Sequence, residues 1–292
     1  MEFGPAECEA ARPLVSLALR EDLGDRGDVT SRIFPLRTER ASVAVVARER
    51  GVLSGLPLLA MVAEEVDREI QIDERLADGR RLSEDDVIAV LSGSPRTLLS
   101  AERTALNFLT HLSGIATLTE RYVSAVTGTR AKILDTRKTL PGWRVLEKYA
   151  VRCGGGTNHR MGLHDGVLIK DNHLAALPEG VSLADAVRTA RNEAPAGMTV
   201  EVEVDSISQL TEVLPARPDI VLLDNMRLGG LVEAVTLRNQ VAPDVLLEAS
   251  GGVTLETVRR IAETGVDRIS IGGLTHSARA LDLGFDWRAE EG

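Results

Sequence analysis

Short apolar runs alternate with helical patterns in the second half of the chain, from about residue 131 onward. The runs are rich in Val, Ile and Leu, which is typical of strands in βα units on a parallel sheet. We expect strands at 131–135, 166–170, 199–204, 219–224, 244–249 and 268–272, and helices at 142–153, 183–194, 206–214, 227–240 and 254–264. Six strands are fewer than the eight of a complete (β/α)₈ barrel, so the pattern predicts an incomplete barrel of six or seven strands.

The first part of the chain has a different pattern. It predicts a mixed α+β unit, with helices near 7–22 and 56–67 and strands near 41–49, 69–73 and 86–92. A long helical pattern at 98–126 then joins this unit to the barrel. We therefore expect one domain at 1–115, rejoined by 275–292, and a barrel domain at 116–274.

A polar stripe runs along the long helical pattern, because Arg103, Asn107, Thr110, Gly114, Thr117 and Arg121 recur every three or four residues. Such a stripe is usually a solvated face, and the pattern alone favours that interpretation. The alternative is that Arg103 reaches a ligand or a neighbouring subunit.

Composition excludes several classes of protein. With 43% hydrophobic residues, the 292-residue chain has the composition of a globular protein. It has no apolar run near the roughly 18 residues that would cross a bilayer. Its first residues do not resemble a signal peptide. Cys8 and Cys153 are too few for a disulfide framework or a four-cysteine zinc site, so we expect a cytoplasmic protein.

The net charge of −10 argues against nucleic acid as a partner. The positive charge is unevenly distributed, however. Residues 135–170 contain seven Lys or Arg and three acids, and His159 and His164 lie in the same stretch. This local surplus of cations indicates a site for a small anion. Arg144, Lys148 and Arg152 have helical spacing, which favours a solvated helix face for these three.

Polar or glycine residues follow every predicted strand of the barrel. Because the carboxyl ends of parallel strands meet at one mouth, we expect these side chains to share a site. The residues are Asp135, Arg137 and Lys138; Lys170 and Asp171; Glu203 and Asp205; Asp224 and Asn225; Glu248 and Ser250; and Gly272.

Two glycine pairs follow the last two predicted strands, in Ser250-Gly251-Gly252 and Gly272-Gly273. Backbone N–H groups without side chains, next to a helix, form good phosphate sites. The earlier loop Cys153-Gly154-Gly155-Gly156-Thr157-Asn158-His159-Arg160 requires close backbone approach or positive φ. We expect it to bring His159 and Arg160 to the mouth, where arginines can grip carboxylate or phosphate.

Glu203 and Asp224 are carboxylates on successive strands. They could hold Mg²⁺ or sugar hydroxyls, or they could pair with the nearby cations, and spacing does not decide between these roles. In the run TVEVEVD, alternation puts Glu201 on the same face as Glu203. The histidines are too scattered for a metal site, and no His-x-Glu or Cys-x-x-Cys accompanies them.

Several segments together closely resemble the quinolinate phosphoribosyltransferase family, also called carboxylating nicotinate-nucleotide pyrophosphorylase. They are ERTALNFLTHLSGIAT, DTRKTLPGWR, GGGTNHRMGLHDGVLIKDNH, VEVEVDS, VLLDNM, LEASGGV and ISIGGLTHS. The resemblance extends over essentially the whole chain to about Trp287. It departs slightly from the family pattern at Gly273, where alanine is expected.

The resemblance implies an N-terminal α/β sandwich domain, an open seven-stranded α/β barrel and a homodimer whose subunits share their sites. It implies that Arg103 enters the partner's site and binds quinolinate with Arg137, His159, Arg160 and Lys170. Thr136, Lys138, Glu203 and Asp224 would contact phosphoribosyl pyrophosphate, with Mg²⁺ held by Glu203 and Asp224. The 5′-phosphate would lie at Ser250, Gly251 and Gly252 and at Ile271, Gly272 and Gly273.

The activity implied by the resemblance is phosphoribosyl transfer to N1 of quinolinate with loss of CO₂, in NAD biosynthesis. Lys138, Lys170, Glu203 and Asp224 would then be the catalytic residues. Three alternatives remain: a nicotinate phosphoribosyltransferase without decarboxylation, an aldolase that forms a Schiff base on Lys170, and a non-catalytic anion sensor.

Overall fold

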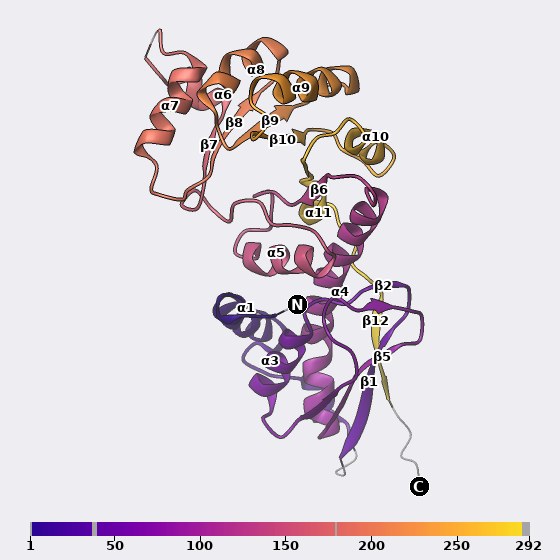
Figure 1. The fold of residues 1–292 in the computed structure, drawn as a ribbon. Coiled ribbons are helices and arrows are strands. Elements are labelled where there is room, and N and C mark those ends of the chain that lie inside the picture. The colour runs from indigo at the N-terminus through magenta and orange to yellow at the C-terminus, as the bar shows by residue number, and fades with distance from the viewer. Residues whose placement is uncertain (1, 37–39, 179, 288–292) are drawn as a thin grey trace. The chain divides into compact units, whose positions relative to one another are not determined.

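A computed structural model describes residues 2–36, 40–178 and 180–287 (Figure 1). The chain divides into two units. The first consists of Met1–Glu120, Thr139–Gly155 and Leu274–Gly292, and the second consists of Arg121–Lys138 and Gly156–Gly273.

An antiparallel sheet forms the centre of the first unit, with strand order β12-β1-β5-β3. These strands are β1 (Ala41–Ala47), β3 (Gln71–Glu74), β5 (Val87–Gly93) and β12 (Leu283–Trp287), and a two-stranded sheet pairs β2 (Gly51–Val52) with β4 (Arg81–Leu82). The predictions for β1, β3 and β5 are confirmed. The three strands without a prediction are short, and two of them have only two residues, too few to show an alternation.

The helices of the first unit begin with α1 (Pro5–Leu23), α2 (Val29–Ile33) and α3 (Leu56–Val66). Ala11, Val15 and Leu19 recur every four residues and are buried, so they form the stripe that packs α1 into the unit. The helices predicted near 7–22 and 56–67 are therefore confirmed, whereas α2 was not predicted.

The long helix is α4 (Pro95–Ala125), and its polar stripe is only partly solvated. Arg103 and Asn107 are exposed. Gly114 is buried against the backbone of Arg279, so closely that a Cβ there would collide with the Arg279 carbonyl oxygen. Thr110 is also covered, since its carbonyl accepts the N–H of Leu281 at 2.9 Å. No helix among the described residues is both long and apolar enough to cross a membrane.

Residues 139–155, which the sequence pattern assigns to the barrel domain, belong to the first unit. They contain α5 (Arg144–Cys153), whose Arg152 pairs with Glu7 of α1 at 2.6 Å. The prediction of a solvated face is wrong for Lys148, which is fully buried. After the helix, a Cβ at Gly154 would collide with Ala116 of α4, and Gly155 has φ +83°, so both glycines are needed for this close approach.

The second unit is an open α/β barrel of parallel strands in the order β6-β11-β10-β9-β8-β7 (Figure 1). The strands are β6 (Lys132–Leu134), β7 (Val167–Ile169), β8 (Val200–Val204), β9 (Ile220–Asp224), β10 (Leu246–Ser250) and β11 (Arg268–Ser270). The connecting helices are α7 (Leu183–Glu193), α8 (Ile207–Val213), α9 (Leu228–Val241) and α10 (Val258–Ala262), with shorter turns in α6 (Asp171–Ala175) and η1 (Leu214–Ala216). The short helix α11 (Gly273–His276) follows β11, and all but its first residue belong to the first unit. All six predicted strands are confirmed to within about two residues.

The barrel has six strands in the part of the chain described, one fewer than the family resemblance implies. The place beside the edge strand β6 is taken by a single residue, Thr157, which forms a parallel bridge with Leu134. Its N–H donates to Ile133 (2.8 Å), but the chain then turns away. The seventh position is thus reduced to one bridge, and β6 and β7 are the two edges of the sheet.

A buried ion pair stabilises the amino ends of β10 and β11. Arg238 is 1% exposed, and its Nη1 lies 2.7 Å from Asp267 Oδ2 and 2.6 Å from the carbonyl oxygen of Val245. Asp267 also accepts the N–H of Leu247 at 2.9 Å and pairs with Arg130 at 2.5 Å. The carboxylate of Asp267, just before β11, therefore joins α9, β10 and the turn that contains Arg130.

Removing that carboxylate should strongly destabilise the second unit. We expect Asp267→Ala to lower the free energy of unfolding by about 3–5 kcal/mol, because Arg238 is left buried without its counter-ion. Asp244→Ala is the matched control, since its carboxylate is 91% exposed and lies 3.9 Å from Arg217; it should change stability by about 0.5 kcal/mol or less. Urea denaturation of the two variants measures both, and equal effects would contradict this account.

Candidate active site

A hollow of about 410 Å³ opens at the carboxyl ends of the barrel strands in the second unit. Every strand of the sheet contributes to it, either from its last residues or from the loop that follows. The lining residues are Thr136, Arg137, Lys138, His159, Arg160, Leu168, Lys170, Glu203, Leu222, Asp224, Glu248, Ser250 and Ser270.

Strand alternation explains why these side chains face the hollow. Residues two apart on a strand point to the same side, so one inward residue near the middle of a strand is followed by another at its end. Leu222 and Asp224 on β9 form such a pair, as do Glu248 and Ser250 on β10. The inner position is apolar or buried, and the outer position offers a polar group to the mouth.

Four cations line this hollow, namely Arg137, Lys138, Arg160 and Lys170. The two arginines repel each other. The pKa of Arg160 is lowered, first by burial and second by the charge of Arg137. Arg160 Nη1 also donates to the carbonyl of Gly166 at 2.9 Å, which holds its side chain in place. Lys138 is exposed, whereas Lys170 forms an ion pair with Glu203. Of the roles that the sequence left open for Glu203, pairing with a nearby cation is therefore present in this structure.

A buried polar cluster lies beneath the hollow. His159 Nε2 is 3.0 Å from Glu201 Oε2 and 3.4 Å from Glu248 Oε1, and Arg268 Nε donates to Glu248 Oε2 at 2.6 Å. Burial raises the pKa of Glu201, as does the charge of Glu248. Burial also opposes ionisation of Glu248, but His159 and Arg268 outweigh it and lower its pKa.

Opposing influences act on the pKa of the His159 ring. Burial lowers this pKa, but the carboxylates of Glu201 and Glu248 outweigh burial and raise it to about 9. The ligand atoms of these three residues lie within 4.8 Å of one another, a spacing that a metal ion could bridge. Arg268 already supplies a cation to the same carboxylates, so we interpret the cluster as an ion-pair and hydrogen-bond network.

The glycine pairs expected to bind phosphate lie at the ends of β10 and β11. Gly251 has φ +98° and Gly252 has φ +59°. A Cβ at Gly251 would collide with Oδ1 of Asn225, whose own N–H donates to the carbonyl of Ser250 at 2.8 Å. The second pair, Gly272-Gly273, leads into the short helix α11.

The structure brings most of the predicted site residues to one hollow. Arg137, Lys138, His159, Arg160, Lys170, Glu203, Asp224 and Ser250 all line it, as does Thr136. Gly251, Gly252, Ile271, Gly272 and Gly273 follow the strands that end there but are not among the lining residues. Arg103 is exposed on α4 in the first unit.

The sequence pattern did not single out Leu168, Leu222 and Ser270, which line the hollow, or Arg268, which lies behind it. The signal that could have found the first three is strand alternation, because each lies two residues before a residue that was named at a strand end. Arg268 lies on the same face, two residues before Ser270. Glu201 was placed on the correct face, but its contact with His159 joins residues 42 positions apart and has no local signature.

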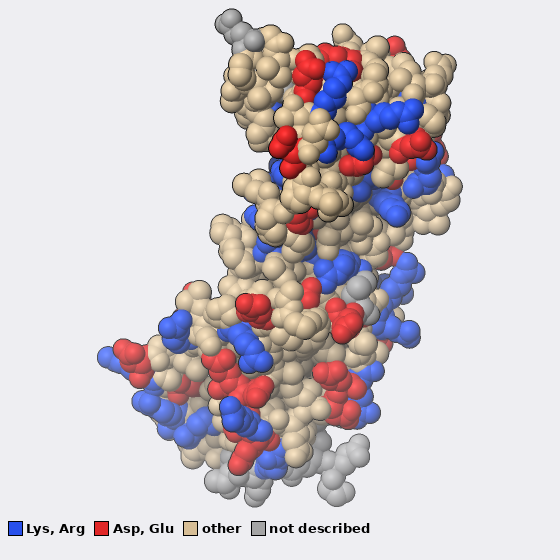
Figure 2. Space-filling model, turned by 60° about the vertical axis from the view of Figure 1, so that its left-hand side comes forward, with Lys and Arg blue, Asp and Glu red and all other residues tan. Residues whose placement is uncertain are grey.

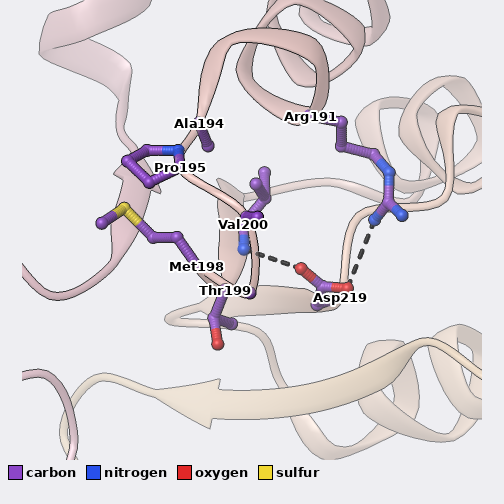
Figure 3. Close-up of a pocket in the computed structure, with 9 residues that line it drawn as sticks. Arg191, Ala194, Pro195, Met198, Thr199, Val200 and Asp219 are labelled. Carbon is purple, nitrogen blue, oxygen red and sulfur yellow. Dashed lines mark hydrogen bonds and ion pairs between the residues drawn. The ribbon is translucent and has the colours of Figure 1, made fainter.

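Another hollow lies at the opposite end of the strands. It is lined by residues 194–200, Arg191 and Asp219 (Figure 3). Asp219 accepts the N–H of Val200 at 2.8 Å, and its other oxygen lies 3.3 Å from Arg191. In α/β barrels the amino ends of the strands contribute to stability, and these contacts tie β8 to β9. We therefore regard this hollow as structural.

The charge distribution agrees with a small-anion site. On the face that Figure 2 shows, Lys and Arg side chains alternate with Asp and Glu, and no wide surface of one sign is visible. A nucleic acid would need such a positive surface.

Comparison with known families gives two matches along the chain. The family model described as "Quinolinate phosphoribosyl transferase, C-terminal domain" matches residues 115–286. The corresponding N-terminal domain model matches residues 28–113.

Individual proteins with similar sequences cover almost the whole chain. The Mycobacterium leprae protein named nicotinate-nucleotide pyrophosphorylase [carboxylating] is 46% identical over 96% of this chain and 98% of its own. A Bacillus subtilis protein with that name, qualified as probable, is 40% identical over 91% of this chain and 89% of its own.

Solved structures are also similar to this chain over most of its length. NadC from Streptococcus pyogenes superposes with a TM-score of 0.89 at 40% identity, covering 99% of this chain and 100% of that one. Human nicotinic acid phosphoribosyltransferase superposes with a TM-score of 0.61 at 15% identity, covering 94% of this chain and 73% of that one, which is a likeness of fold alone.

The two neighbouring glycines after β10 should differ in tolerance to alanine. Gly251→Ala combines positive φ with a collision at Asn225, so we expect it to cost more than the ~1–2 kcal/mol of a left-handed residue. Gly252→Ala has positive φ but open space around it, so its cost should stay within that range. Chemical denaturation measures both, and an equal or smaller cost at Gly251 would contradict the geometry described.

Proposed function

The chain belongs to the quinolinate phosphoribosyltransferase family, and from that premise we propose that it transfers the phosphoribosyl group of phosphoribosyl pyrophosphate to N1 of quinolinate. The reaction releases CO₂ and pyrophosphate and gives nicotinate mononucleotide for NAD biosynthesis. The observation that carries this proposal is the hollow at the carboxyl ends of the barrel strands, where four cations of an acidic protein converge. Both substrates are anions, so their approach is costly unless fixed cations offset their repulsion.

Quinolinate, a dianion, fits the part of the hollow lined by arginines. Arg137 and Arg160 can each donate two parallel N–H bonds to a carboxylate, and Lys170 adds a point charge. We include His159 in this group, since it lines the same hollow.

Phosphoribosyl pyrophosphate would occupy the other side of the hollow, on β8 and β9. Lys138 and Thr136 would contact it with Glu203 and Asp224. These two carboxylates are half-buried on adjacent strands and line one hollow, so their donor set suits Mg²⁺, which prefers oxygen ligands. Bound there, Mg²⁺ would neutralise part of the pyrophosphate charge. The 5′-phosphate would lie at the backbone of Ser250, Gly251 and Gly252 and of Ile271, Gly272 and Gly273.

This arrangement needs no nucleophile from the protein. The bond from C1 to pyrophosphate breaks through an oxocarbenium-like state, and the lone pair of the pyridine nitrogen forms the new bond. The ring nitrogen is then cationic. Loss of the 2-carboxylate as CO₂ leaves an electron pair on C2, which that charge stabilises until a proton is taken up. Lys138 and Lys170 would assist mainly by charge, and positioning dominates.

The aldolase alternative, with a Schiff base on Lys170, is less well supported, because the similar proteins described above are named nicotinate-nucleotide pyrophosphorylases. The likeness to human nicotinic acid phosphoribosyltransferase concerns the fold alone, so nothing specific favours the nicotinate reaction.

The proposal includes a homodimer in which Arg103 of each subunit enters the partner's site. What supports it is the exposure of Arg103 on α4, where its guanidinium is accessible to a partner subunit. A cytoplasmic location is part of the same proposal and is supported by the free thiols of Cys8 and Cys153.

One assay tests the reaction itself. With quinolinate, phosphoribosyl pyrophosphate and Mg²⁺, we expect nicotinate mononucleotide to form, with one CO₂ released for each pyrophosphate. Removing Mg²⁺ with EDTA should stop turnover, and borohydride with carbonyl compounds should leave Lys170 unmodified. Pyrophosphate release with nicotinate and no CO₂ would instead support the non-decarboxylating alternative.

A mixing experiment tests the shared site. Arg103→Ala and Arg137→Ala should each be inactive alone, but subunit exchange creates a hybrid dimer in which one site carries neither change. Random exchange should restore up to roughly a quarter of the wild-type activity. Arg260→Ala, which alters an exposed arginine of α10, is the control and should be fully active. No recovery after confirmed exchange would contradict the donation of Arg103.

A further inference from the structure

The buried cluster beneath the active site contains charged residues to which the proposed reaction assigns no role. Glu201 and Glu248 are 4% and 0% exposed at their side chains, and Arg268 is 20% exposed. Burying a carboxylate costs free energy unless its oxygens are hydrogen-bonded or paired with a cation. At Glu201 this cost is not offset at one oxygen, because Oε1 has no hydrogen-bond partner among the described residues.

His159 has the most contacts in this cluster. Its backbone N–H donates to Asp135 Oδ1 at 2.9 Å, and its Nε2 faces Glu201 and Glu248. Its Nδ1 accepts the backbone N–H of Arg160 at 2.8 Å. Both ring nitrogens therefore have partners within the protein.

The contact at Nδ1 determines which form of the ring this geometry contains. A hydrogen bond from the Arg160 N–H requires a lone pair on Nδ1, so the proton lies on Nε2. Glu201 Oε2 is its acceptor at 3.0 Å, and Glu248 Oε1 lies farther away at 3.4 Å. A doubly protonated ring would place its Nδ1–H against the backbone N–H of Arg160. The carboxylates of Glu201 and Glu248 favour a second proton on the ring. The backbone N–H of Arg160 opposes this second proton, because it would have to lie on Nδ1.

The consequence for the active site concerns Arg160 and Arg137. Arg160 follows His159 directly, and Arg137 lies two residues after Asp135, which also accepts Asn158 Nδ2 at 2.5 Å. The buried network thus contacts the backbone at His159 and Arg160, in the loop that brings Arg160 to the hollow. This matters because the charge of Arg137 acts against that of Arg160 in the same hollow.

We propose that Glu201 and Glu248 are positioning residues that fix the imidazole of His159, and that this ring holds Arg160 in place for the carboxylates of quinolinate. The proposal rests on the proposed function for the identity of that ligand. It gives His159, which also lines the hollow, a positioning role as well.

Two substitutions of Glu201 separate hydrogen bonding from charge. Glu201→Met removes the acceptor for Nε2–H and should raise KM for quinolinate about tenfold, the effect of one lost hydrogen bond. KM for phosphoribosyl pyrophosphate should stay within about threefold, because Arg160 does not bind it. Glu201→Gln keeps an acceptor oxygen and should restore both values to near wild type. Glu233→Gln, on an exposed glutamate of α9, is the control.

The proposal is overturned if the Gln variant is as impaired as the Met variant, since charge would then be the cause. It is equally overturned if the Met variant folds and its KM for quinolinate is unchanged. Thermal unfolding of each variant separates a loss of fold from a loss of positioning.

A measurement on the unaltered protein without substrates is independent of the reaction. In protein labelled with ¹⁵N-histidine, ring NMR signals near neutral pH should show His159 protonated at Nε2 and unprotonated at Nδ1, with the assignment made from His159→Gln. A proton on Nδ1 would overturn the proposal even if the variants failed to fold. If this signature is found but quinolinate is not converted, the proposed function fails while the positioning of Arg160 stands.

Discussion

Crowding of like charge in one small hollow is the constraint on which the active site depends. Arg137 and Arg160 are near enough for the charge of one to lower the pKa of the other, after burial has lowered it first. Lys138 and Lys170 line the same hollow. Such a group of cations is unfavourable by itself, and carboxylates of the protein together with anionic substrates would offset it. An acidic chain can build this site only by confining the cations to one place.

The open barrel provides that confinement through geometry. Parallel strands end at one mouth, and the alternation of side chains gives each strand an outer polar group above an inner buried one. Glu203 and Asp224 lie at the mouth, whereas Glu201 and Glu248 lie below it. The lower layer is bound to Arg268 and His159 and fixes the loop that carries Arg160, so the rigid part of the unit supports the charged part.

Much of this arrangement follows from the sequence because it depends on local periodicity. The six barrel strands, and the polar residues after them such as Lys170 and Asp224, could be predicted from alternation alone. The contact of His159 with Glu201 could not, because it depends on the path of a glycine-rich loop. Nor could the burial of Lys148, since helical spacing describes a face but not what packs on it. The single bridge of Thr157 escaped prediction for a similar reason, because one residue has no period.

The account can be tested most directly by a crystal structure of the protein with quinolinate bound. It predicts that the two carboxylates of the ligand lie in the hollow of the barrel, within hydrogen-bonding distance of the guanidinium groups of Arg137 and Arg160 and near Lys170. Quinolinate bound elsewhere, or in the hollow with its carboxylates directed away from these cations, would contradict the claim that the cations converge to neutralise the substrates.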